Sequence, residues 1–166
     1  MPSDHKARER AFQDHIVNAL QASGWMVGES AKYDRERALY PEDLLAYVQQ
    51  SQPEGWGKFC KTYGEEPERH LLNAAVRALE GQERGTLWLL RNQIEDRGHR
   101  LSVATFKPDH DLNPELTARY AMNRLRVVPE LIYSPHGYDG RLDLTLFLNG
   151  LPIATLELKS CFKQSL

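Results

Sequence analysis

Apolar residues recur at helical spacing through the first half of the chain, which predicts helices there. A first stripe follows a polar lead and consists of Phe12, Ile16, Ala19, Leu20 and Ser23. Gly24 suits the end of this helix, because glycine readily adopts the backbone conformation of a helix C-terminus. A second helix is expected after Pro41, a residue that fits the first helical position. Its stripe consists of Leu44, Leu45 and Val48.

Helix-breaking residues separate this second helix from a third. Pro53, Gly55 and Gly57 are expected to interrupt the chain. The third pattern opens at Pro67, and Gly81 should close it. Its stripe consists of Leu71, Leu72, Ala75, Val76 and Leu79. We expect all three stripes to pack in a core rather than to bind a cofactor.

The pattern changes at Thr86, where short apolar runs replace the helical spacing. Residues 87–90 and 101–106 are expected to form a hairpin, because residues 96–98 (Asp-Arg-Gly) offer a turn between them.

A short helix through Leu125 is predicted next, with Asn113 as its cap and Pro114 as its first residue. Three strands are expected after it, at residues 127–133, 142–148 and 151–159. Helices first and mostly antiparallel strands later predict a mixed α/β (α+β) domain.

The last expected hairpin carries the most informative charges. Asp143, Glu157 and Lys159 stand in strands that are otherwise apolar or weakly polar. A lone buried charge is costly, so charges on core strands need partners or a metal ion. Two carboxylates on neighbouring strands supply the oxygen ligands that Mg²⁺ prefers. The alternative is structural: Asp143 pairs with Lys159, and Glu157 reaches solvent at the sheet edge.

The turn signal at Asn149 and Gly150 bears on which face each carboxylate occupies. A plain two-residue hairpin would place Asp143 and Glu157 on opposite faces of the sheet. A three- or five-residue loop, or a bulge near Pro152, would place both on one face and gather the leucines on the other. Core burial favours this shifted register, which we therefore predict.

Residues 143–152, followed by the Glu-Leu-Lys of residues 157–159, resemble the PD-(D/E)xK nuclease core of type I restriction enzyme R (motor) subunits. The resemblance continues upstream through residues 89–91, 120–128 and 132–134, and through Glu9 and the Gly24-Trp25 pair. It covers almost the whole chain. The resemblance implies a restriction-endonuclease-like fold, with a mixed, largely antiparallel sheet flanked by helices. We expect one domain over residues 1–166, with residues 33–85 as a helical insertion.

The same resemblance implies a Mg²⁺-dependent DNA endonuclease in which Mn²⁺ can substitute. Asp143 and Glu157 would ligate the metal, with the backbone carbonyl of Leu158 as a further ligand. Lys159 would orient the attacking water and offset the charge that builds on the phosphate. Glu9 matches the first-helix acid of many such nucleases, and its alternative is a solvated carboxylate near a helix start.

The chain departs from the family pattern in two respects. Pro129 and Glu130 stand where the family commonly has an arginine and a glutamine, and we expect this difference to change either the entry of a strand or a contact with DNA. The helix that follows the catalytic lysine, the helicase domains and a Walker A sequence are not found in these 166 residues. We expect the chain to be an N-terminal piece of a larger protein. ATP would act only through the helicase domains, and methyltransferase and specificity subunits would be partners.

Composition and charge limit the class of protein, its expected share of DNA binding and its expected location. The 166 residues, 41% hydrophobic and 27% charged, suit one soluble domain with a sizeable core. The net charge is −2 and the basic residues are dispersed, so other domains or subunits should hold most of the DNA. Cys60 and Cys161 give no disulfide framework, and no apolar run approaches the ~20 residues that span a bilayer. We expect a cytoplasmic protein with no membrane partner.

Two other functions stay open at this point. The first is a non-catalytic docking domain that keeps the nuclease fold to bind the motor or a partner subunit. Asp143, Glu157 and Lys159 argue against it, because docking does not require them. The second is a stand-alone repair nuclease of the same superfamily.

Overall fold

The computed structural model of the protein describes residues 2–82, 84–110, 112–138 and 140–159. The helices of this part are α1 (Pro2–Ala22), the 3-10 turn η1 (Ser30–Lys32), α2 (Pro41–Ser51), α3 (Pro53–Tyr63), α4 (Pro67–Glu80), α5 (Thr86–Arg91) and α6 (Pro114–Ala121). The strands are β1 (Met26–Val27), β2 (Gln93–Asp96), β3 (His99–Ser102), β4 (Leu125–Ile132), β5 (Arg141–Leu148) and β6 (Leu151–Leu156). No helix within these ranges is long and apolar enough to cross a membrane.

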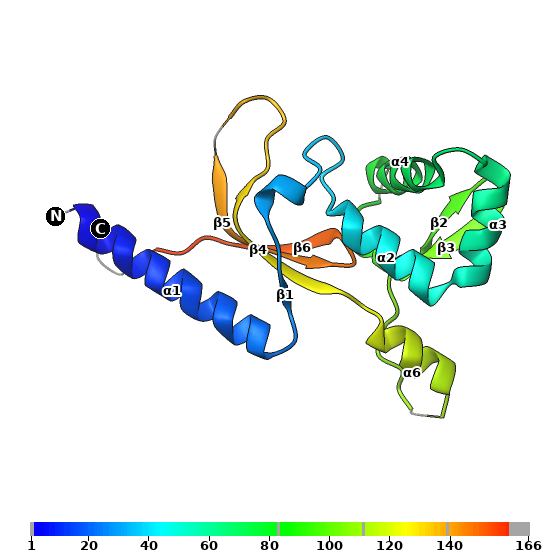
Figure 1. Ribbon diagram of the computed structural model, residues 1–166, viewed down its shortest axis with the longest axis horizontal. Helices are drawn as coiled ribbons and strands as arrows, with labels where there is room; N and C mark the ends of the chain where they lie inside the picture. The colour runs from blue at the N-terminus through cyan, green and yellow to red at the C-terminus, as the bar shows by residue number, and fades with distance from the viewer. Residues whose placement is uncertain (1, 83, 111, 139, 160–166) are drawn as a thin grey trace.

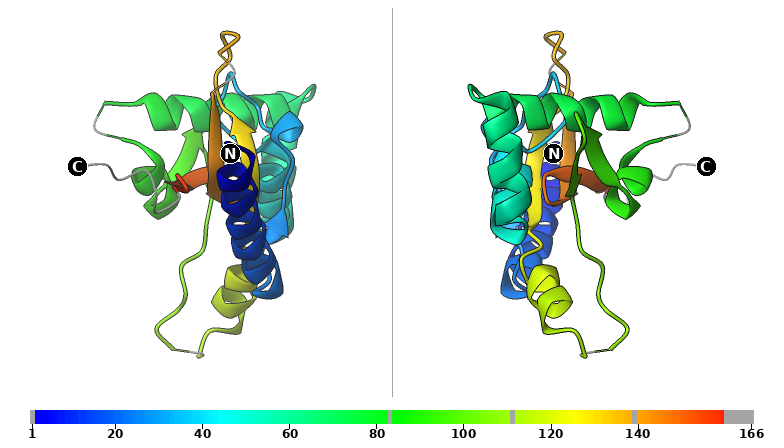
Figure 2. Two further views of the ribbon diagram at one scale, coloured as in Figure 1. Left: turned by 90° about the vertical axis from the view of Figure 1, so that its left-hand side faces the viewer. Right: turned by 90° about the vertical axis from the view of Figure 1, so that its right-hand side faces the viewer.

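The main sheet has the strand order β1-β4-β5-β6, and β2 and β3 form a separate hairpin (Figure 1). The short β1 is parallel to β4, whereas β5 is antiparallel to both of its neighbours, β4 and β6. Figure 2 shows α4 crossing one end of the molecule, with α6 at the other end. This is the mixed α/β fold that the sequence predicts, consistent with a restriction-endonuclease-like architecture.

Helix α1 is present as predicted, and Gly24 just beyond it has a φ of 92°. The predicted stripe is confirmed only in part: Ile16 and Leu20 are half-buried, whereas Ala19 and Ser23 are exposed. Phe12 is 55% exposed, whereas Gln13 is only 8% exposed. The Gln13 amide donates a hydrogen bond to the backbone carbonyl of Asp143 at 2.7 Å. A polar residue can therefore take the buried position, because its amide finds a partner on the sheet.

Helices α2 and α4 agree with the prediction, but the expected interruption between them is wrong. Pro53, Gly55 and Gly57 lie in the first turns of α3, where a proline at the first position costs no hydrogen bond. Gly55 has a packing reason: a Cβ added there would lie 3.2 Å from the Leu101 side chain. The glycine thus lets the helix approach β3 closely rather than breaking it.

The hairpin of residues 93–102 also corrects part of the prediction. Residues 87–90 belong to α5, and the first strand is β2, which pairs Ile94 with Leu101 on β3. The expected turn is confirmed, with Arg97 and Gly98 both at positive φ. A short apolar run fits a helix as well as a strand, which explains the error. The second strand ends at Ser102, and Phe106 is 57% exposed.

Helix α6 begins as predicted. The Asn113 side chain accepts a hydrogen bond from the Leu116 backbone N–H at 3.1 Å. The helix ends at Ala121 instead of Leu125, because Leu125 opens β4 and pairs with Leu148 of β5.

The β5–β6 hairpin has the shifted register that the sequence predicts. Asn149 and Gly150 make a two-residue turn, with φ of 48° and 80°, between the paired residues Leu148 and Leu151. Phe147 then pairs with Pro152 and Leu146 with Ala154, so Ile153 is an extra residue on β6. The predicted bulge near Pro152 is therefore confirmed.

Candidate functional site

Asp143 lies half-buried on β5, at the junction of three segments. One carboxylate oxygen, Oδ2, accepts a hydrogen bond from the Leu158 backbone N–H at 2.6 Å. Its backbone carbonyl accepts the Gln13 amide of α1. The carboxylate is therefore held against the segment that follows β6, because a charge-assisted bond of this length is strong.

The bulge determines which residues share a face with Asp143. Thr145 pairs with Thr155, and Leu144 with Leu156. Continuing this register by one residue places Asp143 opposite Glu157, on the face that carries the two threonines. In the plain register, Asp143 would instead have opposed a leucine.

Glu157 and Lys159 lie beyond the last residue of β6 and are both exposed. No ion pair joins Asp143 to Lys159 in the part of the chain that the structure describes. The structural alternative therefore does not account for Asp143, whose carboxylate binds the backbone of Leu158 instead.

A pocket of about 560 Å³ opens between α1 and this end of the sheet. Glu9 and Gln13 line it from α1, and Asp143 and Leu158 line it from β5 and the segment after β6. Of the predicted site residues, the structure brings Glu9, Asp143 and Leu158 together here. Glu157 and Lys159 do not line the pocket.

The pocket also contains charged residues that the sequence analysis did not select. Lys6 and Arg10 line it from α1, and Arg141 from the start of β5. The sequence offered one sign that Gln13 faces the sheet: it lies at helical spacing from Ile16 and Leu20, on the same side of the helix. Lys6, Arg10 and Arg141 gave none, because isolated basic residues are common on solvated surfaces.

Pro129 and Glu130, the two residues that depart from the family pattern, line this same pocket. Pro129 pairs with Leu144 and Leu131 with Leu142, so Glu130 occupies the position between these pairs, across from Asp143. Its φ of 50° shows a left-handed backbone, which interrupts the regular ladder. Glu130 therefore adds a carboxylate to the wall of the pocket, which Glu9, Asp14 and Asp143 also line.

The donor set fits Mg²⁺ in its chemistry. No group of three or more His, Cys, Asp or Glu side chains converges as a metal site among the described residues. Mg²⁺ needs less than that, since it is commonly bound by one or two carboxylates together with substrate phosphate and water. Asp143 and Glu157 would supply two carboxylates and Leu158 a backbone oxygen.

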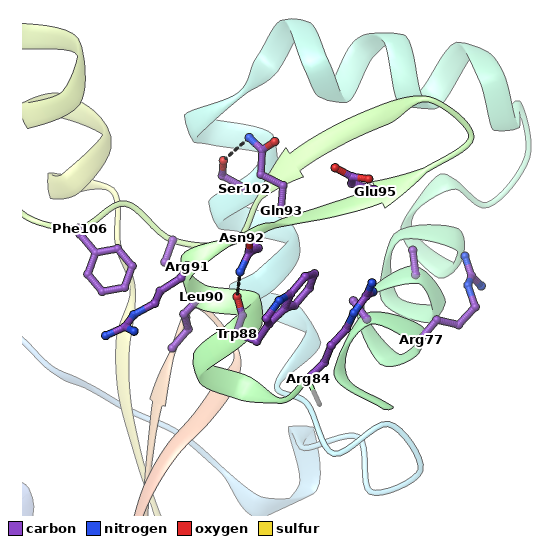
Figure 3. A pocket seen from close by; sticks show the side chains of 13 residues that line it. Arg77, Arg84, Trp88, Leu90, Arg91, Asn92, Gln93, Glu95, Ser102 and Phe106 are labelled. Atoms are coloured by element: carbon purple, nitrogen blue, oxygen red, sulfur yellow. Dashed lines mark hydrogen bonds between the residues drawn. The ribbon is translucent and has the colours of Figure 1, made fainter. Parts of the chain in front are cut away.

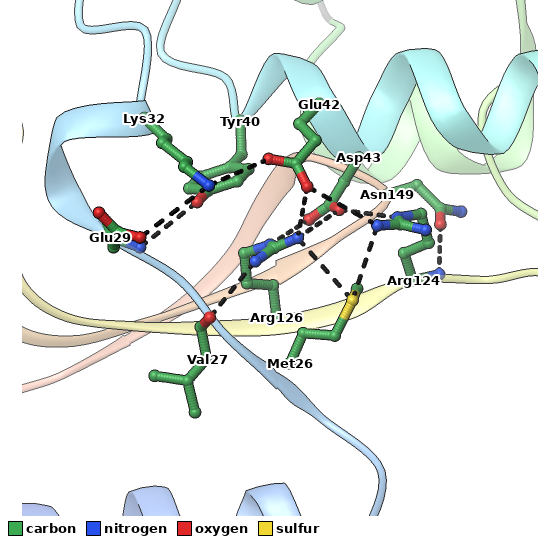
Figure 4. A network of polar contacts seen from close by, with 10 residues as sticks. All are labelled: Met26, Val27, Glu29, Lys32, Tyr40, Glu42, Asp43, Arg124, Arg126 and Asn149. Carbon is green, nitrogen blue, oxygen red and sulfur yellow. Dashed lines mark hydrogen bonds and ion pairs between the residues drawn. The ribbon is translucent and has the colours of Figure 1, made fainter.

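A buried ion network behind the site ties β4 to α2 (Figure 4). Asp43 has no exposed side-chain surface and binds two arginines. Arg126 donates from Nε at 2.6 Å and from Nη2 at 2.8 Å, and Arg124 donates from Nε at 2.7 Å. The Asp43 carboxylate raises the pKa of Arg126, although burial opposes this. The network fixes the strand next to β5 against the helical part.

The Asn149 turn is anchored on the same side of the molecule. Its side-chain oxygen accepts the Arg124 backbone N–H at 2.6 Å, and its amide donates to the Val103 carbonyl at 2.9 Å. Asn149 is completely buried, so these bonds replace the water that it loses. The turn that precedes the bulge is thus fixed in place.

Comparison with known proteins gives one result for this chain. A family model described as type I restriction enzyme R protein N terminus matches residues 7–165. No curated protein and no solved structure matches. The match spans nearly all of the sequence, including every residue of the pocket apart from Lys6. The chain therefore belongs to the family of N-terminal domains of type I restriction enzyme R proteins.

Proposed function

We propose that this domain is a Mg²⁺-dependent endonuclease module that hydrolyses DNA phosphodiester bonds within a type I restriction enzyme. The observation that carries the proposal is the bulge at Ile153. Continued by one residue beyond the end of β6, its register would place Asp143 opposite Glu157 on one side of the sheet. Family membership supports the same function, because restriction enzymes cut DNA.

The side chains have complementary tasks in this reaction. Asp143 and Glu157 would hold Mg²⁺, and the Leu158 carbonyl would be a further ligand. When bound, the ion supplies positive charge that polarises the scissile phosphate. Lys159 would orient the attacking water and stabilise the negative charge that develops on the phosphate. Glu9 faces the same pocket from α1 and would assist at the metal.

The pocket also offers cations for the DNA backbone. Lys6, Arg10 and Arg141 surround the carboxylates, and all three are exposed. Contacts of this kind position a duplex without reading its sequence. We therefore assign them to the phosphates that flank the scissile bond.

Metal binding tests the proposal directly. In the presence of a short DNA duplex, calorimetry with Mn²⁺ should show binding that Asp143→Asn abolishes. Asp109→Asn is the matched control, because Asp109 is exposed and lies outside the pocket. Equal binding by both variants would overturn the assignment of Asp143.

Cleavage is best measured in the assembled enzyme. The domain alone is expected to be nearly inactive, because cutting in such systems is coupled to ATP-driven translocation by the motor and to the methyltransferase and specificity subunits. In the complete assembly, Asp143→Asn and Glu157→Gln should each lower the cleavage rate about 100-fold or more, while ATP hydrolysis continues. Robust, specific cutting of linear DNA by the domain alone would show that the other parts are dispensable.

A second candidate is a non-catalytic docking domain that binds the motor or partner subunits. It is favoured by one observation: Glu157 and Lys159 do not line the pocket that holds Asp143. Such a domain would assemble normally and would show no metal binding that depends on Asp143. The same calorimetry therefore distinguishes the two candidates.

A further inference from the structure

A second pocket, of about 540 Å³, lies far from α1, between α4, α5 and the β2–β3 hairpin. Three arginines line it: Arg77 from α4, Arg84 from the segment before α5, and Arg91 from the end of α5. Figure 3 shows them spread along the pocket rather than converging. Arg91 extends toward Phe106 at one end, Arg84 lies over Trp88, and Arg77 lies at the other end. We call this set the arginine pocket.

The charges of the arginine pocket are only partly neutralised. Arg77 pairs with Asp96 at 3.0 Å, and Glu95, the acidic residue of the lining, pairs with Arg100 at 3.1 Å. Arg84 and Arg91 make no ion pair with any residue that the structure describes. Two guanidinium groups therefore remain available for an anion from outside the molecule.

Flat surfaces for stacking lie beside these cations. The Arg84 guanidinium carbon is 4.3 Å from the centre of the Trp88 ring, which holds the guanidinium over the indole. Its outer side is exposed to solvent, because Arg84 is an exposed residue. The Phe106 ring is 57% exposed although it is apolar. Unpaired bases stack on aromatic rings and on arginine guanidinium planes alike.

We propose that the arginine pocket binds a single-stranded stretch of nucleic acid, with Arg84 and Arg91 on the backbone phosphates and unpaired bases on Arg84 and Phe106. Cations arranged in a row, with flat side chains between them, match the alternating phosphates and bases of a single nucleic-acid strand. A free phosphate or a mononucleotide is instead bound by cations that converge on one point. The choice of DNA over RNA rests on the proposed function. The binding of a single strand does not depend on it.

Binding to a fluorescein-labelled oligo(dT) strand, measured by anisotropy with EDTA present, tests this without any cleavage. The double variant Arg84→Gln/Arg91→Gln should weaken binding about tenfold or more. It should also reduce the slope of log K against log[salt] by about 1.4, because each lost phosphate contact on a single strand contributes about 0.7. Phe106→Ala should weaken binding about fivefold or more and leave that slope unchanged.

Arg35→Gln is the matched control, because Arg35 is an exposed arginine outside the arginine pocket. All the replaced side chains are exposed, and circular dichroism melting should confirm that each variant folds. The proposal is overturned if the wild-type protein does not bind the strand, or if the double variant and Arg35→Gln bind alike. A loss of duplex binding in the double variant as large as its loss of single-strand binding would also overturn it.

Two further arms identify the ligand and separate the two proposals. An RNA strand of the same length that binds tighter than DNA would leave the pocket assignment standing and refute the choice of DNA. If inorganic phosphate or a mononucleotide displaces the oligonucleotide fully at equal phosphate concentration, the pocket binds a single phosphate group, and the proposal of a bound strand is refuted. Asp143→Asn should bind oligo(dT) like the wild type, so a failed nuclease test leaves this result unaffected.

Discussion

Replacing Asp43 by asparagine tests whether the buried ion network holds the helical part to the sheet. The substitution keeps the shape of the side chain and removes its charge. Asp43 accepts three charge-assisted hydrogen bonds of 2.6 to 2.8 Å from Arg124 and Arg126. The Arg126 side chain is 7% exposed, and its one remaining acidic partner among the described residues would be the half-exposed Glu42, 3.5 Å from Nη2.

The expected loss follows from this burial. Removing one partner of a buried ion pair costs about 3–5 kcal/mol, because the other charge is left uncompensated. A domain of this size has a free energy of unfolding of about 5–15 kcal/mol, so the loss is a large share of the total. With a urea m-value of about 2 kcal/mol/M, the denaturation midpoint should fall by about 1.5–2.5 M.

Urea denaturation followed by circular dichroism measures this shift. Asp109→Asn is again the control, and an exposed substitution of this kind should stay within about 0.5 kcal/mol of the wild type. A second variant, Asp43→Asn combined with Arg126→Met, should lose less than the sum of its single changes, because the buried cation is gone as well. A midpoint shift below about 0.5 M for Asp43→Asn, with unchanged m, would refute the idea that this network secures the sheet.

Three shorter predictions concern the hairpin and α1. Gly150→Ala should destabilise the fold by about 1–3 kcal/mol in thermal melting, because the added Cβ would lie 2.3 Å from the Tyr40 carbonyl and φ is 80°. Deleting Ile153 and Ala154 together should abolish Mn²⁺ binding in calorimetry with DNA, because Asp143 and Glu157 would move to opposite faces. Deleting Ile153 alone should preserve binding, because Leu146 still pairs with Ala154 and Asp143 stays opposite Glu157; equal binding by both deletions would refute the register argument. Gln13→Ala should lower the free energy of unfolding by about 1 kcal/mol, measured in urea, since the Asp143 carbonyl loses its partner.

The sequence predicted best where one physical rule acted alone. Proline and asparagine at helix starts located α2, α4 and α6, whereas Pro53 begins α3 but was interpreted as a break because two glycines follow it. The bulge on β6 was predictable for a similar reason. One register gathered the leucines of both strands on one face and the other did not, and Pro152 could not donate to the ladder in either case.

Prediction failed where a residue had a tertiary partner. Gly55 was interpreted as a helix breaker, but in α3 it admits the Leu101 side chain. Phe12 rather than Gln13 was predicted to be buried. The sequence around Gln13 does not indicate its hydrogen-bond partner, the Asp143 carbonyl, which lies 130 positions away. Glu130 gave no local sign of its left-handed backbone, which interrupts the ladder beside the site. The pocket depends on such long-range contacts, so its full lining could not be predicted.

The Asp43 network also bears on the order in which the chain can fold during synthesis. Its carboxylate bonds to arginines that follow 81 and 83 positions later. Until those residues leave the ribosome, α2 carries an acid with no cationic partner on the strand, and its final docking has to wait. Contacts of such high contact order delay folding, and a nascent chain that stalls before β4 would expose the unfinished helical part to chaperones and proteases.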